Sequence, residues 1–157
     1  MTLAVHHPTG ATHDVRGRRL LNEFAKKHGW EVRHGPEDQP APIDAILVSG
    51  DHIIAVVEVR TRVTHSLDAI ERMGGTYLIT HQKLLDLMEG GRLFGVPSFL
   101  VVGLACGTRW GWRIGNREGT PYFSWDTERT RTRATSLDAS TTVRLNAYIP
   151  LRHGVQW

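Results

Sequence analysis

An apolar run at residues 53–60, Ile-Ile-Ala-Val-Val-Glu-Val-Arg, follows a second apolar stretch at 43–48 after the short link Ser-Gly-Asp-His. Two such stretches joined by a Gly-Asp link are typical of a β-hairpin. Alternate side chains of a strand point to opposite faces. We therefore expect one face made of Ile53, Ala55, Val57 and Val59 and another made of Ile54, Val56, Glu58 and Arg60. The first face is wholly apolar and should pack on helices; the second becomes charged only at its end.

The remaining patterns predict a mixture of helices and strands around this hairpin. Helices are predicted over 13–29, about 67–73 and 80–89, the last with Leu84, Leu85, Leu87 and Met88 on its core side and an end or interruption at Gly90-Gly91. Strands are predicted over 30–33, 77–79, 99–104 and 110–114, with a last edge strand over 143–149. Residues 115–141 are polar and are predicted to be irregular. The order of elements predicts an α/β protein.

Length and composition favour one domain of 157 residues, with a core over about 13–115, a polar, arginine-rich segment over 115–141 and a last strand over 143–149. The single cysteine, Cys106, rules out an internal disulfide and follows an apolar run, so we expect a buried thiol. There is no signal-peptide pattern and no apolar run near the roughly 20 residues of a membrane helix. We therefore expect a cytoplasmic protein that has no membrane partner.

Two acidic residues stand at neighbouring ends of the predicted hairpin strands. Asp44 enters the first strand, and Glu58 lies near the end of the second. Mg²⁺ prefers carboxylate oxygens and takes only a few protein ligands, so these two acids and a backbone carbonyl such as that of Val59 would suffice. Such a metal ion stabilises charge during phosphodiester cleavage. The alternative is that Glu58 makes a structural salt bridge with Arg60 or Arg62.

The number of residues in the hairpin decides whether the two acids share a face. Opposed residues of a hairpin keep a constant index sum, and the sum for Asp44 and Glu58 is even. A plain two-residue Gly50-Asp51 turn would place them on opposite faces. We therefore predict an odd-length turn or a β-bulge between the strands.

Pro42-Ile43-Asp44 followed by Glu58-Val59-Arg60 at the end of an apolar strand resembles the PD-(D/E)XK nuclease superfamily, which includes restriction endonucleases and archaeal-type Holliday junction resolvases. The segments 76–84 and 96–102 are similar to the helix and strand that follow the core in such small nucleases, so the resemblance covers roughly residues 14–104. It implies a restriction endonuclease-like fold, with a central mixed β-sheet flanked by helices. It also implies a Mg²⁺-dependent DNA endonuclease in which Mn²⁺ can substitute, often a homodimer, with branched DNA as a candidate substrate.

The resemblance also implies roles for particular residues. Asp44 and Glu58 match the metal-binding acids, Glu23 matches an acid that some families place on the first helix, and Gln82 matches a polar residue of resolvase-like members. Arg60 stands where lysine is usual, and an arginine stays protonated, so it can stabilise charge but shuttles protons poorly. Arg60 could act electrostatically, Lys83 could replace the lysine, or the site could be weakened.

The basic residues are concentrated late in the chain. Residues 1–108 carry 11 basic and 12 acidic side chains, whereas residues 109–157 carry 8 and 4, and all eight late cations are arginine. Arginine binds phosphate through a planar fork of donors, although a solvated surface would explain this excess equally well. The candidate DNA-contact residues are Arg62, His65, Arg109, Arg113, Arg129, Arg131 and Arg133.

Three functions therefore remain open: a metal-dependent DNA endonuclease, a DNA-binding protein on a nuclease scaffold with weak or lost catalysis, and a structural or interaction domain whose acids make only salt bridges. Arg60 is the residue that favours the second of these.

Overall fold

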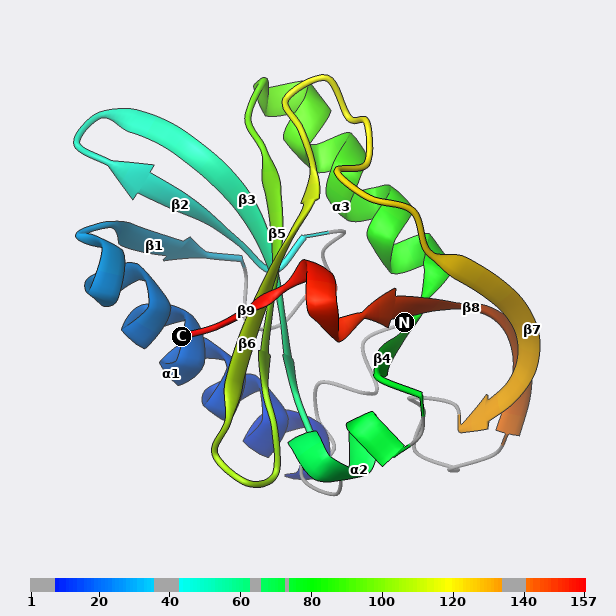
Figure 1. Ribbon diagram of the computed structural model, residues 1–157. Coiled ribbons are helices and arrows are strands. Elements are labelled where there is room, and N and C mark those ends of the chain that lie inside the picture. Colours follow the sequence, from blue (N-terminus) through cyan, green and yellow to red (C-terminus); the bar gives the residue numbers. More distant parts are fainter. Residues whose placement is uncertain (1–7, 36–42, 63–65, 73, 134–140) are drawn as a thin grey trace.

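The computed structural model describes residues 8–35, 43–62, 66–72, 74–133 and 141–157 (Figure 1). Its helices are α1 (Pro8–His28), α2 (Leu67–Arg72), α3 (His81–Phe94) and the 3-10 turn η2 (Leu151–His153). Its strands are β1 (Glu31–His34), β2 (Ala45–Ser49), β3 (His52–Thr61), β4 (Thr76–Thr80), β5 (Ser98–Gly103), β6 (Arg109–Gly115), β7 (Asp126–Arg133), β8 (Thr141–Pro150) and β9 (Val155–Gln156). None of the helices in these ranges is both long and apolar enough to cross a membrane.

A mixed sheet forms the centre of the described chain, with the strand order β1-β2-β3-β5-β6-β9. The pair β3 and β5 is parallel, and the other neighbours are antiparallel. The parallel pair needs a crossover, which α2, β4 and α3 supply. The expected α/β fold, a central mixed sheet flanked by helices, is confirmed.

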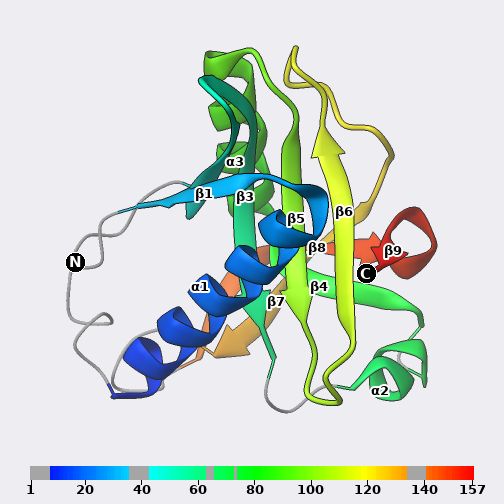
Figure 2. The same cartoon turned by 90° about the vertical axis from the view of Figure 1, so that its left-hand side faces the viewer.

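Helices α1 and α3 cover opposite faces of this sheet (Figures 1 and 2). The α1 side has a core of Leu20, Leu21, Phe24 and Ala25 against Ala45, Leu47, Ala55, Val57 and Val101. The α3 side has Leu84, Leu87 and Met88 against residues that include Val56, Leu100 and Ile114. Strand β3 is buried between the two helices, as its apolar faces predicted.

A β-bulge interrupts the hairpin of β2 and β3. Leu47 is paired with Ala55 but Val48 with Ile53, which leaves Ile54 as the extra residue before the two-residue turn Gly50-Asp51. The prediction allowed an odd-length turn or a bulge, and the structure has the bulge. The predicted faces of the first two residues of the run were wrong, because the bulge exchanges them: Ile53 packs on the α3 side and Ile54 on the α1 side.

Helix α3 continues through Gly90 and Gly91 and ends at the left-handed Gly95, so the predicted end at the glycine pair was wrong. A Cβ on Gly91 would lie 2.7 Å from the Val96 carbonyl oxygen. Gly91 therefore does not break the helix. Its missing side chain leaves room for the chain segment at Val96, which passes close to α3. Leu85 was also misassigned to the core. It is 40% exposed, because the buried stripe follows residues 84, 87, 88 and 91.

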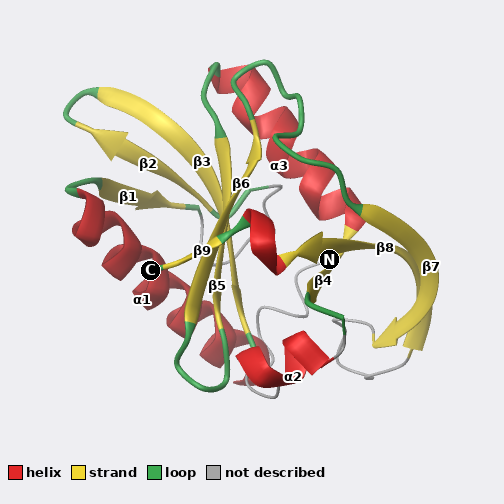
Figure 3. Ribbon diagram, in the orientation of Figure 1, coloured by secondary structure: helices red, strands yellow, loops and turns green. Residues whose placement is uncertain are grey.

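The prediction that residues 115–141 are irregular was wrong for a long part of that segment. Residues 126–133 form the strand β7, which pairs with β8 in a second sheet of order β4-β8-β7 (Figure 3). The strand predicted over 143–149 exists as β8, but it is the central strand of that sheet and does not lie at an edge. Cys106 was also misplaced: its thiol is exposed and contacts the Thr108 hydroxyl at 3.0 Å.

Candidate active site

Asp44 is held against the end of β3 by main-chain contacts on both sides. Its Oδ2 atom accepts a hydrogen bond of 2.8 Å from the Val59 amide, and its carbonyl accepts one of 2.9 Å from the Gly35 amide. Ala45 is paired with Val57, so continuing that register by one residue places Asp44 opposite Glu58. The hairpin thus brings the two acids together at one end of the sheet.

Glu58 is the buried member of this pair, with a relative exposure of 1%. Burial raises the pKa of its carboxyl from 4.5 to about 7. The opposing influence is the charge of Arg60, which lowers the pKa, and a smaller one is that of Lys83. Asp44 raises the pKa of Glu58 through its negative charge and by accepting a hydrogen bond from the protonated carboxyl. Glu58 therefore changes protonation near neutral pH.

Arg60 binds Glu58 directly. Its Nη2 atom lies 2.8 Å from Glu58 Oε1, and its side chain is 33% exposed. Two atoms of this pair are left over: within the described residues, Arg60 Nε is buried without a hydrogen-bond partner, and so is Glu58 Oε2 while the carboxyl is ionised. A buried acceptor and a buried donor without partners are costly unless a ligand completes them.

Lys83 lies in the first turn of α3, on the side of the sheet that Glu58 faces. Its positive charge lowers the pKa of Glu58, which places the ammonium within electrostatic reach of that carboxyl. The structure thus brings together Asp44, Glu58, Arg60 and Lys83 from a strand entry, a strand end and a helix start.

Two further residues implied by the resemblance are not brought to this cluster. The Gln82 side-chain amide donates to Asp86 Oδ1 at 2.9 Å, one turn along its own helix, and is exposed. Glu23 lies on α1, across the sheet from Glu58, where it forms an ion pair with Arg109.

The chemistry of the cluster fits a divalent cation in part. Two carboxylates converge, and the unpartnered Glu58 Oε2 is an acceptor that a cation would satisfy. Among the described residues, no three His, Cys, Asp or Glu side chains gather as a metal-binding group. A third protein ligand would therefore be a backbone carbonyl, for which Val59 is the candidate, and water would complete the coordination.

The candidate DNA-contact residues are widely spread over the structure. Arg62 is tied to β4, because its guanidinium donates to the Tyr77 hydroxyl at 3.0 Å and to the Leu78 carbonyl at 2.8 Å. Arg109 pairs with Glu23, whereas Arg113, Arg129 and Arg131 are exposed. Arg133 is the last residue of β7, and His65 lies outside the described residues.

Tyr77 is a neighbour of the cluster that the sequence reasoning missed. It is 2% exposed, and burial raises the pKa of its phenol, while the charges of Arg62 and Arg60 lower it and that of Glu58 raises it. The Tyr77 hydroxyl, which accepts from Arg62, therefore lies within electrostatic reach of Arg60 and Glu58. The signal in the sequence was weak, since Tyr77 is one residue of a short extended segment.

No protein-family model matches this chain, and no curated protein matches its sequence. Its structure is similar to that of Hjc, a Holliday junction resolvase from the archaeal hyperthermophile Archaeoglobus fulgidus. The TM-score is 0.53 and the identity 14%, over 91% of this chain and 90% of that one. At this identity the likeness shows the fold alone: the chain has the fold of that resolvase.

Proposed function

We propose that this protein is a metal-dependent DNA endonuclease. The observation that carries the proposal is the pair Asp44 and Glu58, two carboxylates side by side of which one is buried and keeps an unpartnered oxygen. Like charges in a low-dielectric setting repel, and a divalent cation between them removes that repulsion. Perturbed carboxyl pairs of this kind are concentrated at functional sites.

Each member of the cluster has a role in this proposal. Asp44 and Glu58 would hold Mg²⁺ or Mn²⁺, which supplies charge stabilisation and a more acidic bound water. Asp44 is oriented by the Val59 amide, and Arg60 orients Glu58 through its Nη2 atom. The free Arg60 Nε donor and the Lys83 ammonium would stabilise the negative charge that develops on the phosphoryl oxygens.

The substrate is proposed from the fold. The similar protein is a Holliday junction resolvase, so branched DNA is the first form to test, before linear and single-stranded DNA. The exposed arginines of β6 and β7, Arg113, Arg129 and Arg131, are proposed to contact phosphates.

A specific contact favours a second candidate, a DNA-binding protein with weak or lost catalysis. Arg60 occupies Glu58 Oε1, and together Arg60 and Lys83 balance the two carboxylates without a metal ion. A cation would then have to compete with an arginine that is already bound.

The test is cleavage of a four-way junction and of supercoiled plasmid, with Mg²⁺ or Mn²⁺, by the wild type and by Asp44→Asn and Glu58→Gln. Removing a metal ligand should lower the rate by on the order of 100-fold to 1,000-fold. Glu23→Gln is the matched control, since it changes the acid of the other ion pair, and it should leave the rate within about twofold.

The outcomes separate the candidates. Absence of cleavage by the wild type on every DNA form, with binding retained, would reject the endonuclease and support the second candidate. Cleavage unaffected by both site substitutions would place the chemistry elsewhere in the molecule.

A further inference from the structure

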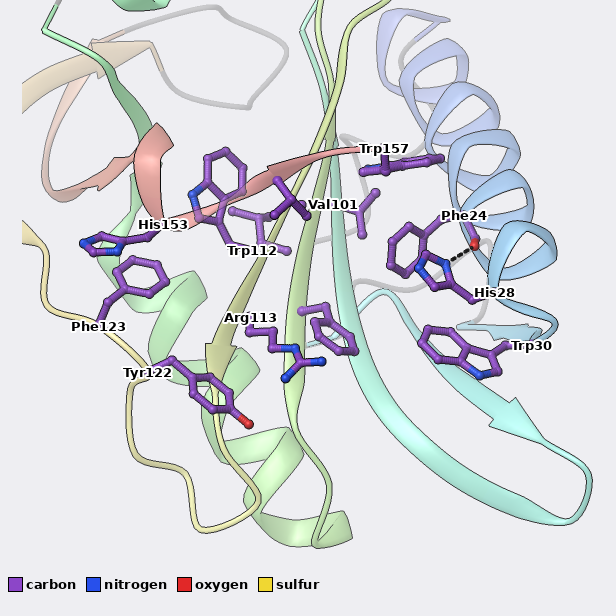
Figure 4. A pocket seen from close by; sticks show the side chains of 14 residues that line it. Phe24, His28, Trp30, Val101, Trp112, Arg113, Tyr122, Phe123, His153 and Trp157 are labelled. Carbon is purple, nitrogen blue, oxygen red and sulfur yellow. Dashed lines mark hydrogen bonds between the residues drawn. The ribbon is translucent and has the colours of Figure 1, made fainter.

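A groove with an aromatic lining lies across β5 and β6, between α1 and the η2 turn, and no residue of the acidic cluster lines it. It has a volume of about 440 Å³, within the rough range of 300–1,000 Å³ that is usual for ligand sites. Figure 4 shows α1 on one side, η2 and the segment after β6 on the other, and β5 and β6 between them. Seven aromatic residues line it: Phe24, Trp30, Phe99, Trp112, Tyr122, Phe123 and Trp157.

Flat ring pairs stand on both sides of the groove (Figure 4). On the α1 side the rings of His28 and Trp30 are stacked, with centroids 4.7 Å apart and planes at 16°. On the other side Phe123 and His153 are stacked at 4.7 Å and 20°. Tyr122 is 49% exposed at the rim. The groove therefore offers planar surfaces to a ligand that is itself planar.

The charged and polar groups of the groove select the kind of planar ligand. The described lining contains His28, Arg113 and His153 but no aspartate or glutamate, so it suits a negative charge. Arg113 lies over the Phe99 ring at 6.0 Å, and its side chain is exposed. The Trp157 ring also lines the groove, but its Nε1 atom is buried against the sheet near Gly111. A planar ring that carries a negative charge describes a nucleotide.

We propose that this groove binds unpaired nucleotides of a DNA strand. The bases stack on the exposed ring of Tyr122 and its aromatic neighbours, and Arg113 contacts the backbone phosphate. The inference rests on the proposed function only in taking DNA as the ligand. Asp44, Glu58, Arg60 and Lys83 do not line the groove, so binding there is separable from cleavage.

The experiment measures the affinity of the whole chain for a fluorescent oligothymidylate in EDTA, where cleavage does not interfere. Tyr122→Ala should weaken binding about tenfold, and Arg113→Gln should weaken it and reduce its salt dependence. Phe94→Ala is the matched control, because Phe94 is also 49% exposed but lies on α3 outside the groove. Arg117→Gln controls for the loss of an exposed arginine. Both controls should bind like the wild type.

Three results would overturn the proposal. In the first, Tyr122→Ala binds as tightly as the wild type or no more weakly than Phe94→Ala. In the second, thymidine monophosphate binds as tightly as the oligonucleotide, which makes the groove a site for free nucleotides. In the third, the wild type binds no single strand but self-associates, and Tyr122→Ala makes it monomeric. Loss of cleavage in Glu58→Gln with oligonucleotide binding unchanged would support both proposals, because cleavage and binding in the groove would then depend on different residues.

Discussion

Two glutamate–arginine pairs lie on opposite faces of the central sheet, and they differ chiefly in burial. In the pair Glu58–Arg60, the Glu58 side chain is 2% exposed, and Arg60 comes from the same strand. In the pair Glu23–Arg109, both side chains are 40% exposed, and they join α1 to β6. The pairing chemistry is the same, but only Glu58 has a second carboxylate beside it.

This difference separates a candidate site from a surface contact. Water screens the exposed pair, which contributes little to stability. The buried carboxyl has lost its hydration and responds to every neighbouring charge, so its protonation, its partner and any cation are coupled. The sequence places Glu58 two residues from Arg60, but it does not reveal that Glu23 pairs with Arg109, which lies far along the chain.

The largest expected effect that would sharpen this comparison is on stability. Arg60→Gln should lower the free energy of unfolding by about 3 kcal/mol at alkaline pH, because Glu58 loses the cation that lowers its pKa and must either stay ionised without a partner or take up a proton. Arg109→Gln should cost about 1 kcal/mol or less, including its contact with the Trp157 ring at 5.3 Å. Urea unfolding of both variants measures the difference. Equal losses would mean that burial does not distinguish the pairs.

The pH dependence of stability comes next. The folded-state pKa of Glu58 is raised from 4.5 to about 7, so the folded state binds more protons than the unfolded chain in that range. Without metal, the contribution of Glu58 to the free energy of unfolding should fall as pH rises from about 5 to 8, by on the order of 3 kcal/mol at most. Glu58→Gln should remove that slope and Glu23→Gln should keep it. Parallel stability–pH curves for the wild type and Glu58→Gln would contradict the raised pKa.

The smallest expected effect concerns Lys83. Lys83→Gln should lower the cleavage rate about tenfold, since one positive charge near the phosphate is lost. Because Lys83 lowers the pKa of Glu58, the pH at which activity is half-maximal should also move upward. Lys27→Gln, an exposed lysine in the last turn of α1, is the control. A rate loss without a shift of the pH profile would argue that Lys83 contributes only to folding or DNA binding.

Local patterns were enough to predict the elements around β3. Its apolar faces indicated a central strand, and the index sum of Asp44 and Glu58 required an odd-length turn or a bulge, of which the structure contains the bulge. The same patterns failed for β7, where alternating threonine and arginine reads as polar and irregular. That strand exists because β8 pairs with it along its length, and such a contact is not local in sequence.

The site was predicted less completely than the fold. The proximity of Asp44 and Glu58 could be predicted, because the two residues face each other across one hairpin. Whether Lys83, Gln82 or Glu23 joins them depends on how α1 and α3 pack on the sheet, which spacing along the chain does not determine. Gln82 turns toward Asp86 and Glu23 toward Arg109, whereas the charge of Lys83 reaches Glu58.

The bulge at Ile54 has a consequence for changes in chain length. A chain that lacks Ile54 would still pair Leu47 with Ala55 and Val48 with Ile53, because those pairings flank the extra residue. The other side chains of β3 would stay on their present faces, and Asp44 would remain opposite Glu58. This hairpin can therefore lose one residue at a single position, at the expense of apolar contacts on the α1 side, without changing the alignment of the two acids.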